Sequence, residues 1–308
     1  MPEHEAPSRE DSNKSIPWEI RNARLHPSPR RALIYVPDSY AVYKPVPLII
    51  ALHGKGQHPS EFEYHTQLSN EETNDRAIVV YPEGINVRKL RSAAVQLLQW
   101  TGDPEAPPRS EVDDISFIDI LIELVCEDYA IQTGRIYVVG FSNGGGLAAL
   151  LAGDPGASTR IAAYAISSGA FYQDEALKEP LFSHPSPARL PVPILEFHGD
   201  SDPVEHYDGK DTPDGPSYNI RDYIEKWVRL NKCVEEPKVQ KLFGGKVEKV
   251  SWSSDKVSDV VQHYKIAGFG HGWPTTYPLD NDEQRHGPTY FDATPIVLEF
   301  LMRFTQGT

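Results

Sequence analysis

Short apolar runs alternate along most of the chain with segments whose apolar residues recur at helical spacing. The runs are almost continuously apolar and rich in β-branched and aromatic residues, as in strands that are covered on both faces. This alternation predicts βαβ units, and therefore an α/β fold with a mostly parallel central sheet flanked by helices. The expected strands lie at 47–54, 77–84, 135–140, 161–169, 192–200 and 261–268.

Helical periodicity is clear in three segments, and the N-terminal part adds two further strands. The helical segments are 113–129, 218–231 and 294–304. The first begins with Asp113 and Asp114, either of which suits an N-cap because its carboxylate can accept from the free N–H groups of the first turn. Residues 18–26 and 31–39 are expected to form an antiparallel pair at a sheet edge.

Two Pro-rich segments, 100–114 and 171–191, interrupt this scheme. Loops at the carboxyl ends of parallel strands line the ligand crevice in open α/β sheets, so we expect walls or a lid over a site. An ordinary surface loop is the alternative for each. The chain has no internal repeat and no long linker, and it is expected to form one domain over 18–308 after a disordered tail at 1–17.

Charge and composition narrow the range of partners and cofactors. The 308 residues include 30 basic and 44 acidic ones, a formal net charge of -14. Such a field repels phosphate backbones and anionic lipids, so neither a nucleic-acid nor a membrane partner is expected. No stretch approaches the roughly 20 apolar residues of a membrane span. No motif with metal-ligand spacing occurs either, and no metal or other cofactor is expected.

The first residues and the cysteines bear on the compartment. Residues 1–15 are polar and lack the basic and apolar regions of a signal peptide. Cys126 and Cys233 are too few for a disulfide scaffold, although a single bridge stays open. These features favour an intracellular chain, and a secreted form trimmed of its leader would look the same.

A serine lies where an expected strand meets a run of small, helix-compatible residues. Residues 140–144, GFSNG, fit the G-x-S-x-G pattern in the strand-turn-helix setting that it requires. A serine on such a strained turn is pushed above the sheet. The residues two before and two after it must be small, because they crowd against neighbouring backbone. Ser142 is therefore a candidate nucleophile, with a glycine-rich turn that has no chemistry as the alternative.

A serine nucleophile needs a base, and the base needs an orienting carboxylate. In the α/β-hydrolase order an Asp or Glu and then a His follow the serine, each after a later strand. The strand at 192–200 ends near Asp200 and Asp202, and the last expected strand is followed by His271. We favour Asp202 because Asp202-Pro203 begins a turn toward the histidine. Asp200 is more easily explained as a residue that stabilises the loop.

The first parallel strand ends in HGKG, residues 53–56. In α/β-hydrolases this position supplies one backbone donor of the oxyanion hole, and the N–H after the nucleophile supplies the other. We therefore expect the turn at Lys55 and Gly56, together with Asn143, to form the hole. His53 itself is expected to be structural.

Three further histidines compete with His271 for the role of the base. His263 lies inside an expected strand and is best explained as a half-buried structural residue. His206 and His286 lie in polar surroundings and are expected to face solvent.

Five segments of the sequence carry a resemblance to a known family: QWTGDPEAPPRSEVDDISFIDILIEL, RIYVVGFSNGGGLAALLA, HGDSDPVEHY, GFGHGWP and FDATPIVLEFL. In these segments the chain resembles the fungal feruloyl esterases of carbohydrate esterase family 1, which are related to acetylxylan esterases and polyhydroxybutyrate depolymerases. The resemblance extends from about Trp18 to the C-terminus. Its serine motif is widely shared, whereas the W-x-G-D-P…V-D-D-x-x-F segment is more specific to the feruloyl branch.

The resemblance implies a single α/β-hydrolase catalytic domain without a metal that hydrolyses hydroxycinnamate esters of plant cell-wall polysaccharide. It also implies Ser142, Asp202 and His271 as a catalytic triad. Members of the family are typically secreted and richer in cysteines. Here Ser253 and Ser254 stand where relatives tend to carry a cysteine, so the second cysteine of this chain is expected to lack a partner.

An aromatic acyl group needs a flat apolar slot, and aromatic residues in the expected loops could provide it. The candidate substrate-binding residues are Trp100, Phe171, Tyr172 and Trp273. The alternative for each is that it packs its own loop down. Two other functions stay open: an esterase for acetyl or short hydroxyacyl groups, and a binding module without catalysis. The intact set of Ser, Asp and His favours an enzyme acting on a small or polysaccharide-linked ester.

Overall fold

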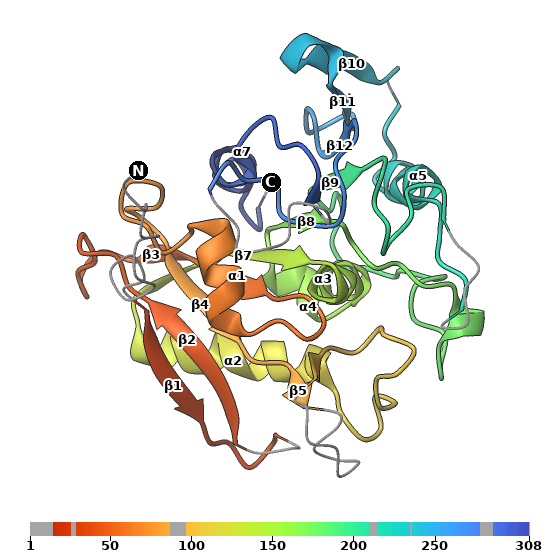
Figure 1. The fold of residues 1–308 in the computed structure, drawn as a ribbon. Coiled ribbons are helices and arrows are strands. Elements are labelled where there is room, and N and C mark those ends of the chain that lie inside the picture. The colour runs from red at the N-terminus through yellow and green to blue at the C-terminus, as the bar shows by residue number, and fades with distance from the viewer. Residues whose placement is uncertain are drawn as a thin grey trace, which may run out of the picture.

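The structure, a computed structural model, describes residues 15–25, 29–86, 97–209, 215–234, 236–277 and 286–307. One large twisted sheet runs through this part of the chain, with helices on both faces (Figure 1). Its strands, in spatial order, are β1 (Ile16–Ile20), β2 (Arg30–Tyr35), β4 (Ile78–Pro82), β3 (Val46–Leu52), β7 (Ile131–Phe141), β8 (Ala163–Ser167), β9 (Ile194–Gly199), β12 (Val261–Ile266), β11 (Val247–Trp252) and β10 (Lys238–Leu242). A separate pair consists of β5 (Ile85–Asn86) and β6 (Leu98–Gln99).

The centre of the sheet is parallel and both edges are antiparallel. The central strands pair in parallel with one another, in the order β4, β3, β7, β8, β9 and β12. At one edge β1 pairs with β2 and β2 with β4, and at the other β12 pairs with β11 and β11 with β10, all antiparallel. The predicted α/β-hydrolase fold with a mostly parallel sheet is confirmed, as is the antiparallel pair near the N-terminus.

Two layers of helices cover the sheet. Alternate residues of a strand face opposite sides, so Leu48 and Ile50 pack into one core and Ile49 and Ala51 into the other. The first core also takes residues of α2 (Asp114–Asp128), α3 (Asn143–Gly153), α4 (Ala157–Arg160) and α5 (Ile220–Leu230). The second takes residues of α1 (Pro59–Thr66) and α7 (Ala293–Leu301). Two further helical turns within the described residues, at Asp174–Ala176 and Phe243–Gly245, are single 3₁₀ turns.

Four elements differ notably from the sequence-based expectation. Helix α1 was not predicted because few of its residues are apolar; it is fixed instead by a capping box between His58 and Glu61. The edge strands β10 and β11 were not predicted either, since β10 is almost entirely polar and exposed. Strand β1 begins at Ile16, before the expected domain boundary at residue 18, and residues 1–14 of the expected tail lie outside the described residues.

Both cysteines are free: Cys126 and Cys233 do not form the single bridge that the sequence left open.

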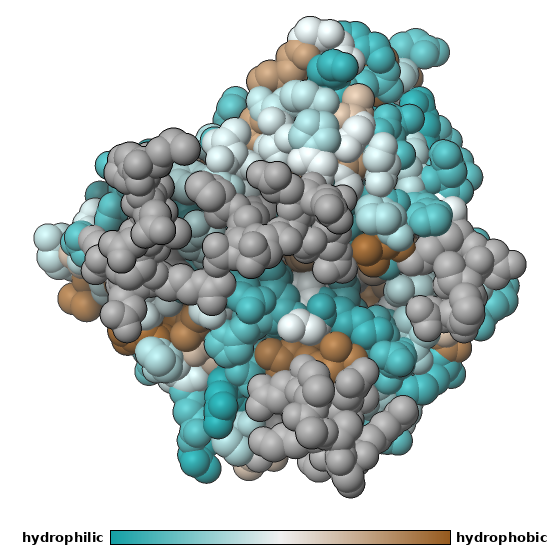
Figure 2. Space-filling model, viewed as in Figure 1, coloured by the Kyte–Doolittle hydropathy of each residue, from teal (hydrophilic) through white to brown (hydrophobic). Residues whose placement is uncertain are grey.

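On the face of the molecule shown in Figure 2, hydrophilic residues dominate the described surface and apolar ones form small patches. Scattered apolar residues of this kind are ordinary on a surface that faces water. Among the described residues, no helix combines the length and apolar character needed to cross a bilayer.

Candidate active site

Ser142 occupies the sharp turn between the end of β7 and the start of α3. Its backbone has φ 53° and ψ -120°, a combination that non-glycine residues rarely adopt. Three main-chain hydrogen bonds hold this turn: Ser142 N–H donates to the Ser167 carbonyl (3.0 Å), and its own carbonyl accepts from Gly146 (2.9 Å) and Ala170 (3.0 Å). The neighbouring strand and the helix therefore fix the strained conformation that the sequence predicts for the serine.

The glycines on either side of the serine leave no room for a side chain. A Cβ at Gly140 would lie 2.3 Å from the Gly144 carbonyl oxygen, and a Cβ at Gly144 would lie 2.2 Å from the Leu52 carbonyl oxygen. Both contacts are with backbone, which cannot move aside cheaply. The expectation that the residues two before and two after the serine must be small is confirmed.

We expect Gly144→Ala to destabilise the protein by at least about 1–3 kcal/mol, because the added methyl group must displace β3 or tilt α3. The free energy of unfolding in urea measures this. Gly134→Ala, on the preceding strand β7, is the matched control: its Cβ would meet nothing within 4 Å. Its unfolding free energy should stay level or rise by up to about 1 kcal/mol. Equal stabilities of the two variants would contradict the steric explanation.

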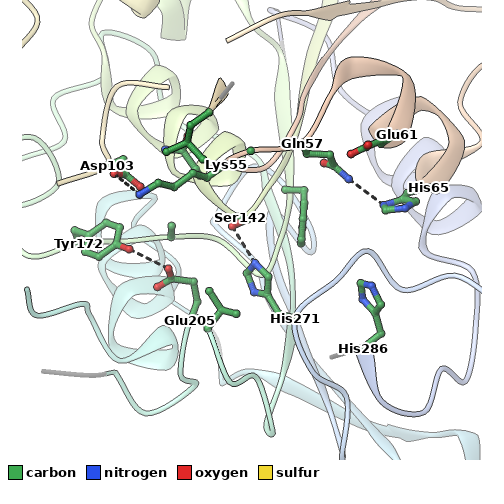
Figure 3. A pocket seen from close by; sticks show the side chains of 16 residues that line it. Lys55, Gln57, Glu61, His65, Asp103, Ser142, Tyr172, Glu205, His271 and His286 are labelled. Carbon is green, nitrogen blue, oxygen red and sulfur yellow. Dashed lines mark hydrogen bonds and ion pairs between the residues drawn. The ribbon is translucent and has the colours of Figure 1, made fainter. Parts of the chain in front are cut away.

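The structure brings the three predicted residues Ser142, His271 and Asp202 together (Figure 3). His271 Nε2 lies 2.9 Å from Ser142 Oγ, and His271 Nδ1 lies 2.8 Å from Asp202 Oδ2. Since a carboxylate only accepts, Nδ1 carries the hydrogen, and Nε2 is left to accept from the serine hydroxyl. All three side chains are buried. The arrangement can activate a serine oxygen next to a pocket.

The loop after β9 holds Asp202 as an ionised carboxylate. Its Oδ1 accepts from the N–H groups of Val204 and Glu205, both at 2.8 Å. Burial raises the pKa of Asp202, but the hydrogen bond and charge of His271, with the charge of His198, outweigh it and hold the pKa below its ordinary value. Asp200 instead accepts from Gly268 N–H at 2.7 Å and is exposed. The geometry thus favours Asp202 as the partner of His271. Asp200 instead connects the loop to the residues after β12.

The expected oxyanion donors need one correction. Gly56 N–H donates to the Leu98 carbonyl at 2.7 Å, so this group is already used by the turn. In the described part of the chain, the N–H groups of Lys55 and Asn143 have no such partner. The Asn143 N–H lies at the start of α3, where helix N–H groups are free. Its side chain exchanges two hydrogen bonds with the Trp100 backbone, which fixes the first turn of the helix.

A pocket of about 480 Å³ opens beside Ser142, within the usual size range of small-molecule sites. Polar side chains lie on both sides of Ser142 and His271 in Figure 3. On one side the Lys55 ammonium pairs with Asp103 (2.9 Å), and the Tyr172 hydroxyl donates to Glu205 (3.2 Å). On the other side lie Gln57, Glu61, His65 and His286. Apolar lining comes from Leu97, Phe141, Ala170 and Val204.

Comparisons with known proteins bear on the class of enzyme. Residues 31–178 match the model of a family described as esterase PHB depolymerase. The putative esterase NocK of Nocardia uniformis subsp. tsuyamanensis is 26% identical over 84% of the chain and 72% of its own length. Feruloyl esterase B of Piromyces equi is 25% identical over 68% of the chain. The chain is an esterase of the α/β-hydrolase fold. It is related to feruloyl and acetylxylan esterases.

Solved structures support the fold of the esterase. The acetyl xylan esterase from Aspergillus awamori aligns with a TM-score of 0.57 and 16% sequence identity, over 87% of the esterase and 97% of that structure. At this identity the likeness concerns the fold alone. The esterase spans only 37% of the length of the Piromyces equi protein, so what that whole protein acts on is not carried over from the match.

Three of the four predicted aromatic contacts are wrong. Trp100, Phe171 and Trp273 are buried in the two cores and do not line the pocket of the esterase. Trp100 Nε1–H donates to the His53 carbonyl, and Trp273 Nε1–H donates to Thr294 Oγ1. Phe171 stacks on Tyr223 with the ring centroids 4.0 Å apart. These rings pack their loops down, which was the alternative given for each; Tyr172 alone lines the pocket.

The histidines of the esterase divide into structural and pocket residues. His53 Nε2 accepts from Gly84 N–H at 2.9 Å, and burial lowers the pKa of His53 to about 4, so it stays neutral in the core. His263 is buried in β12 and His206 is exposed, as expected. The prediction for His286 is wrong: it is half-buried and lines the pocket.

Sequence reasoning missed several residues of the pocket. Gln57, Glu61 and His65 belong to α1 and the turn before it, whose only sequence signal is the capping box of that helix. Phe141 and Glu205 adjoin predicted residues along the chain and could have been included on that ground. In the described residues, no group of three or more potential ligands is arranged for a metal ion. The two Pro-rich segments each contribute one lining residue, Asp103 and Tyr172.

Proposed function

We propose that the esterase works through an acyl-enzyme, with Ser142 as nucleophile, His271 as general base and Asp202 as the orienting carboxylate. The observation that carries the proposal is the hydrogen-bonded chain from Ser142 Oγ through His271 to Asp202, which meets the pocket at the serine. Each residue has the partner that its role requires: the nucleophile faces a base, and the base faces a carboxylate.

The reaction follows from these contacts. Ser142 Oγ attacks the ester carbonyl carbon while His271 Nε2 takes the hydroxyl proton, and Asp202 stabilises the imidazolium that forms. The tetrahedral intermediate collapses as the carbon–oxygen bond of the ester breaks, and His271 gives its proton to the leaving alcohol. Water then attacks the acyl-enzyme with His271 as base, the acid departs, and Ser142 regains its proton.

The N–H groups of Lys55 and Asn143 are the proposed donors to the oxyanion of both tetrahedral intermediates. Support comes from the lack of another partner for either group among the described residues and from the place of Lys55 and Asn143 in the lining of the pocket that holds Ser142. Removing one such donor costs about 2.7–4 kcal/mol of transition-state stabilisation in other serine hydrolases. Gly56, whose N–H is bonded to Leu98, is not included.

Hydroxycinnamoyl esters of plant cell-wall polysaccharide are the proposed substrates. The names of the relatives support this class, and Phe141 and Tyr172 place two aromatic rings in the pocket wall. A second candidate is an acetyl or short hydroxyacyl ester. The burial of Trp100, Phe171 and Trp273 favours this candidate, because these three rings are then not available to contact an aromatic acyl group. The polar lining suits the hydroxyl groups of a sugar in both cases.

A fluorophosphonate probe and an ester panel test the two parts of the proposal. The probe should attach to the peptide that contains Ser142, as located by mass spectrometry, and pretreatment should abolish hydrolysis. Attachment elsewhere, or none, would contradict the nucleophile. Values of kcat/KM on methyl ferulate, p-nitrophenyl acetate and 3-hydroxybutyrate oligomers then decide the substrate. A clear preference for methyl ferulate over both others supports the hydroxycinnamoyl class, and a preference for the acetate or the oligomers supports the second candidate.

A further inference from the structure

A buried histidine, His198, lies directly behind the carboxylate of the proposed triad. It follows Glu196 by two residues on β9, so both side chains point to the same side of the strand, and neither is exposed. His198 Nδ1 lies 2.8 Å from Glu196 Oε1, and His198 Nε2 lies 2.8 Å from the Glu205 main-chain oxygen. The mechanism described above uses neither His198 nor Glu196.

The hydrogen-bond partners of His198 determine its protonation state. The Glu205 carbonyl only accepts, so Nε2 carries a hydrogen. At Nδ1 the partner is the Glu196 carboxylate, whose other oxygen lies 2.6 Å from His263 Nδ1; two such bonds favour the ionised carboxylate. Asp202 Oδ2, 3.6 Å from His198 Nε2, adds a second negative charge. His198 is therefore an imidazolium paired with an ionised Glu196.

The surrounding charges point the same way. Burial lowers the pKa of His198, but the charge and hydrogen bond of Glu196 and the charge of Asp202 raise it to about 9. Burial raises the pKa of Glu196, yet His198 and His263 together hold it below its ordinary value. Tyr207 is a further titratable neighbour: its hydroxyl lies 2.8 Å from His263 Nε2 and its ring packs against His198. Lys265, which pairs with His198 across β9 and β12, has its ammonium 4.4 Å from the centre of the Tyr207 ring.

Asp202 thus lies between two imidazole rings. Its Oδ2 is 2.8 Å from His271 Nδ1 and 3.6 Å from His198 Nε2, while Oδ1 is held by two main-chain N–H groups. A fixed cation on one side keeps the carboxylate ionised. The same cation opposes the protonation of His271 on the other side, since like charges disfavour each other across a buried site.

We propose that His198 is a positioning residue for the reaction: a constantly protonated imidazolium that holds Asp202 ionised and in place, and keeps His271 free to act as a base at mildly acidic pH. The inference rests on the proposed triad. His198 also holds the main chain of Glu205 through its carbonyl oxygen. The side chain of Glu205 accepts a hydrogen bond from Tyr172 in the pocket wall. One buried ion pair thereby supports both the triad carboxylate and a wall of the pocket.

His263 provides a matched control for this role. It is buried to a similar degree and contacts the same Glu196 carboxylate. Its other nitrogen faces the Tyr207 hydroxyl, which can donate, whereas the matching nitrogen of His198 faces a carbonyl that only accepts. No contact joins His263 to Asp202 among the hydrogen bonds and ion pairs of the described residues. A role limited to packing or burial would make His198 and His263 equivalent.

Nitrogen NMR of the protein labelled with ¹⁵N-histidine tests the charge directly. One histidine should keep both ring nitrogens in the imidazolium range from about pH 5 to pH 8, where ordinary histidines lose a proton. That signal should vanish in His198→Gln and persist in His263→Gln. It should move to a neutral form near pH 7 in Glu196→Gln. A neutral His198 at pH 7 in the unaltered protein would overturn the proposal, and this measurement stands even if a variant fails to fold.

The pH profile of kcat/KM tests the function. In His198→Gln the acid limb should move to higher pH by about half a unit or more, because a cation near the base has been removed. In the same variant kcat should fall roughly tenfold or more, with a smaller change in KM. His263→Gln should leave the acid limb in place. Equal profiles for the two variants would overturn the proposal. A failed triad would show separately, as activity retained in Ser142→Ala, while the NMR result is independent of catalysis.

Discussion

Ser142→Ala should lower kcat for ester hydrolysis by about a millionfold, the loss seen when the serine is removed from another Ser-His-Asp site. The Ser142 hydroxyl oxygen is the proposed nucleophile and lies 2.9 Å from the proposed base, and alanine removes it. The fold should be unaffected, because the turn is held by main-chain bonds that alanine keeps. The unfolding free energy is expected to change by less than about 1 kcal/mol.

Ser168→Ala is the matched control for this variant. Ser168 lies just after the neighbouring strand β8, is buried, and also has a positive φ, 47°. Its hydroxyl donates to the Gly272 carbonyl at 3.3 Å and accepts from Gly272 N–H at 3.4 Å. Its removal should therefore lower kcat far less, by about tenfold at most, since it costs two long hydrogen bonds and leaves the Ser142 hydroxyl in place. Activity of Ser142→Ala within tenfold of the unaltered protein, with the probe still attached, would show that another residue is the nucleophile.

The order of the proposed triad could be predicted from the sequence because each of its residues follows a strand that is visible in the apolar pattern. Parallel strands bring their carboxyl ends to one edge of the sheet, so Ser142, Asp202 and His271 could be expected to meet there. The choice of Asp202 over Asp200 used a local turn signal, and the structure has a turn there: the N–H groups of Val204 and Glu205 donate to Asp202 Oδ1.

The direction of loop side chains could not be predicted in the same way. Whether Trp100 faces the pocket or the core depends on its hydrogen bond to the His53 carbonyl, 47 residues away along the chain. Likewise, Gly56 loses its free N–H to Leu98 only because the segments meet in space. The charge of His198 also depends on contacts that form only in the fold, with Glu196, Asp202 and the Glu205 carbonyl. Such contacts carry no periodic signal in sequence.

Asp202→Asn should reduce kcat by about 10⁴-fold while leaving the geometry of the loop intact. The two main-chain N–H groups at Oδ1 require an acceptor, so the amide oxygen must take that position. The amide NH₂ then faces His271 Nδ1 and forces the hydrogen of the imidazole onto Nε2. In that tautomer His271 can no longer accept the proton of Ser142. In the unaltered protein Asp202 Oδ2 lies 3.6 Å from His198 Nε2. In the variant the NH₂ group takes this place, so two donors face each other.

Asp200→Asn separates this effect from a general disturbance of the loop. Asp200 is exposed and accepts from Gly268 N–H through Oδ1, a bond that an asparagine oxygen keeps. Its kcat should therefore stay within about threefold, because a surface change of this kind costs little. Steady-state rates on the best ester of the panel and a comparison of unfolding free energies measure both variants. If Asp200→Asn lost as much activity as Asp202→Asn, the carboxylate of the triad would have to be reassigned, because the tautomer argument applies to only one of the two positions.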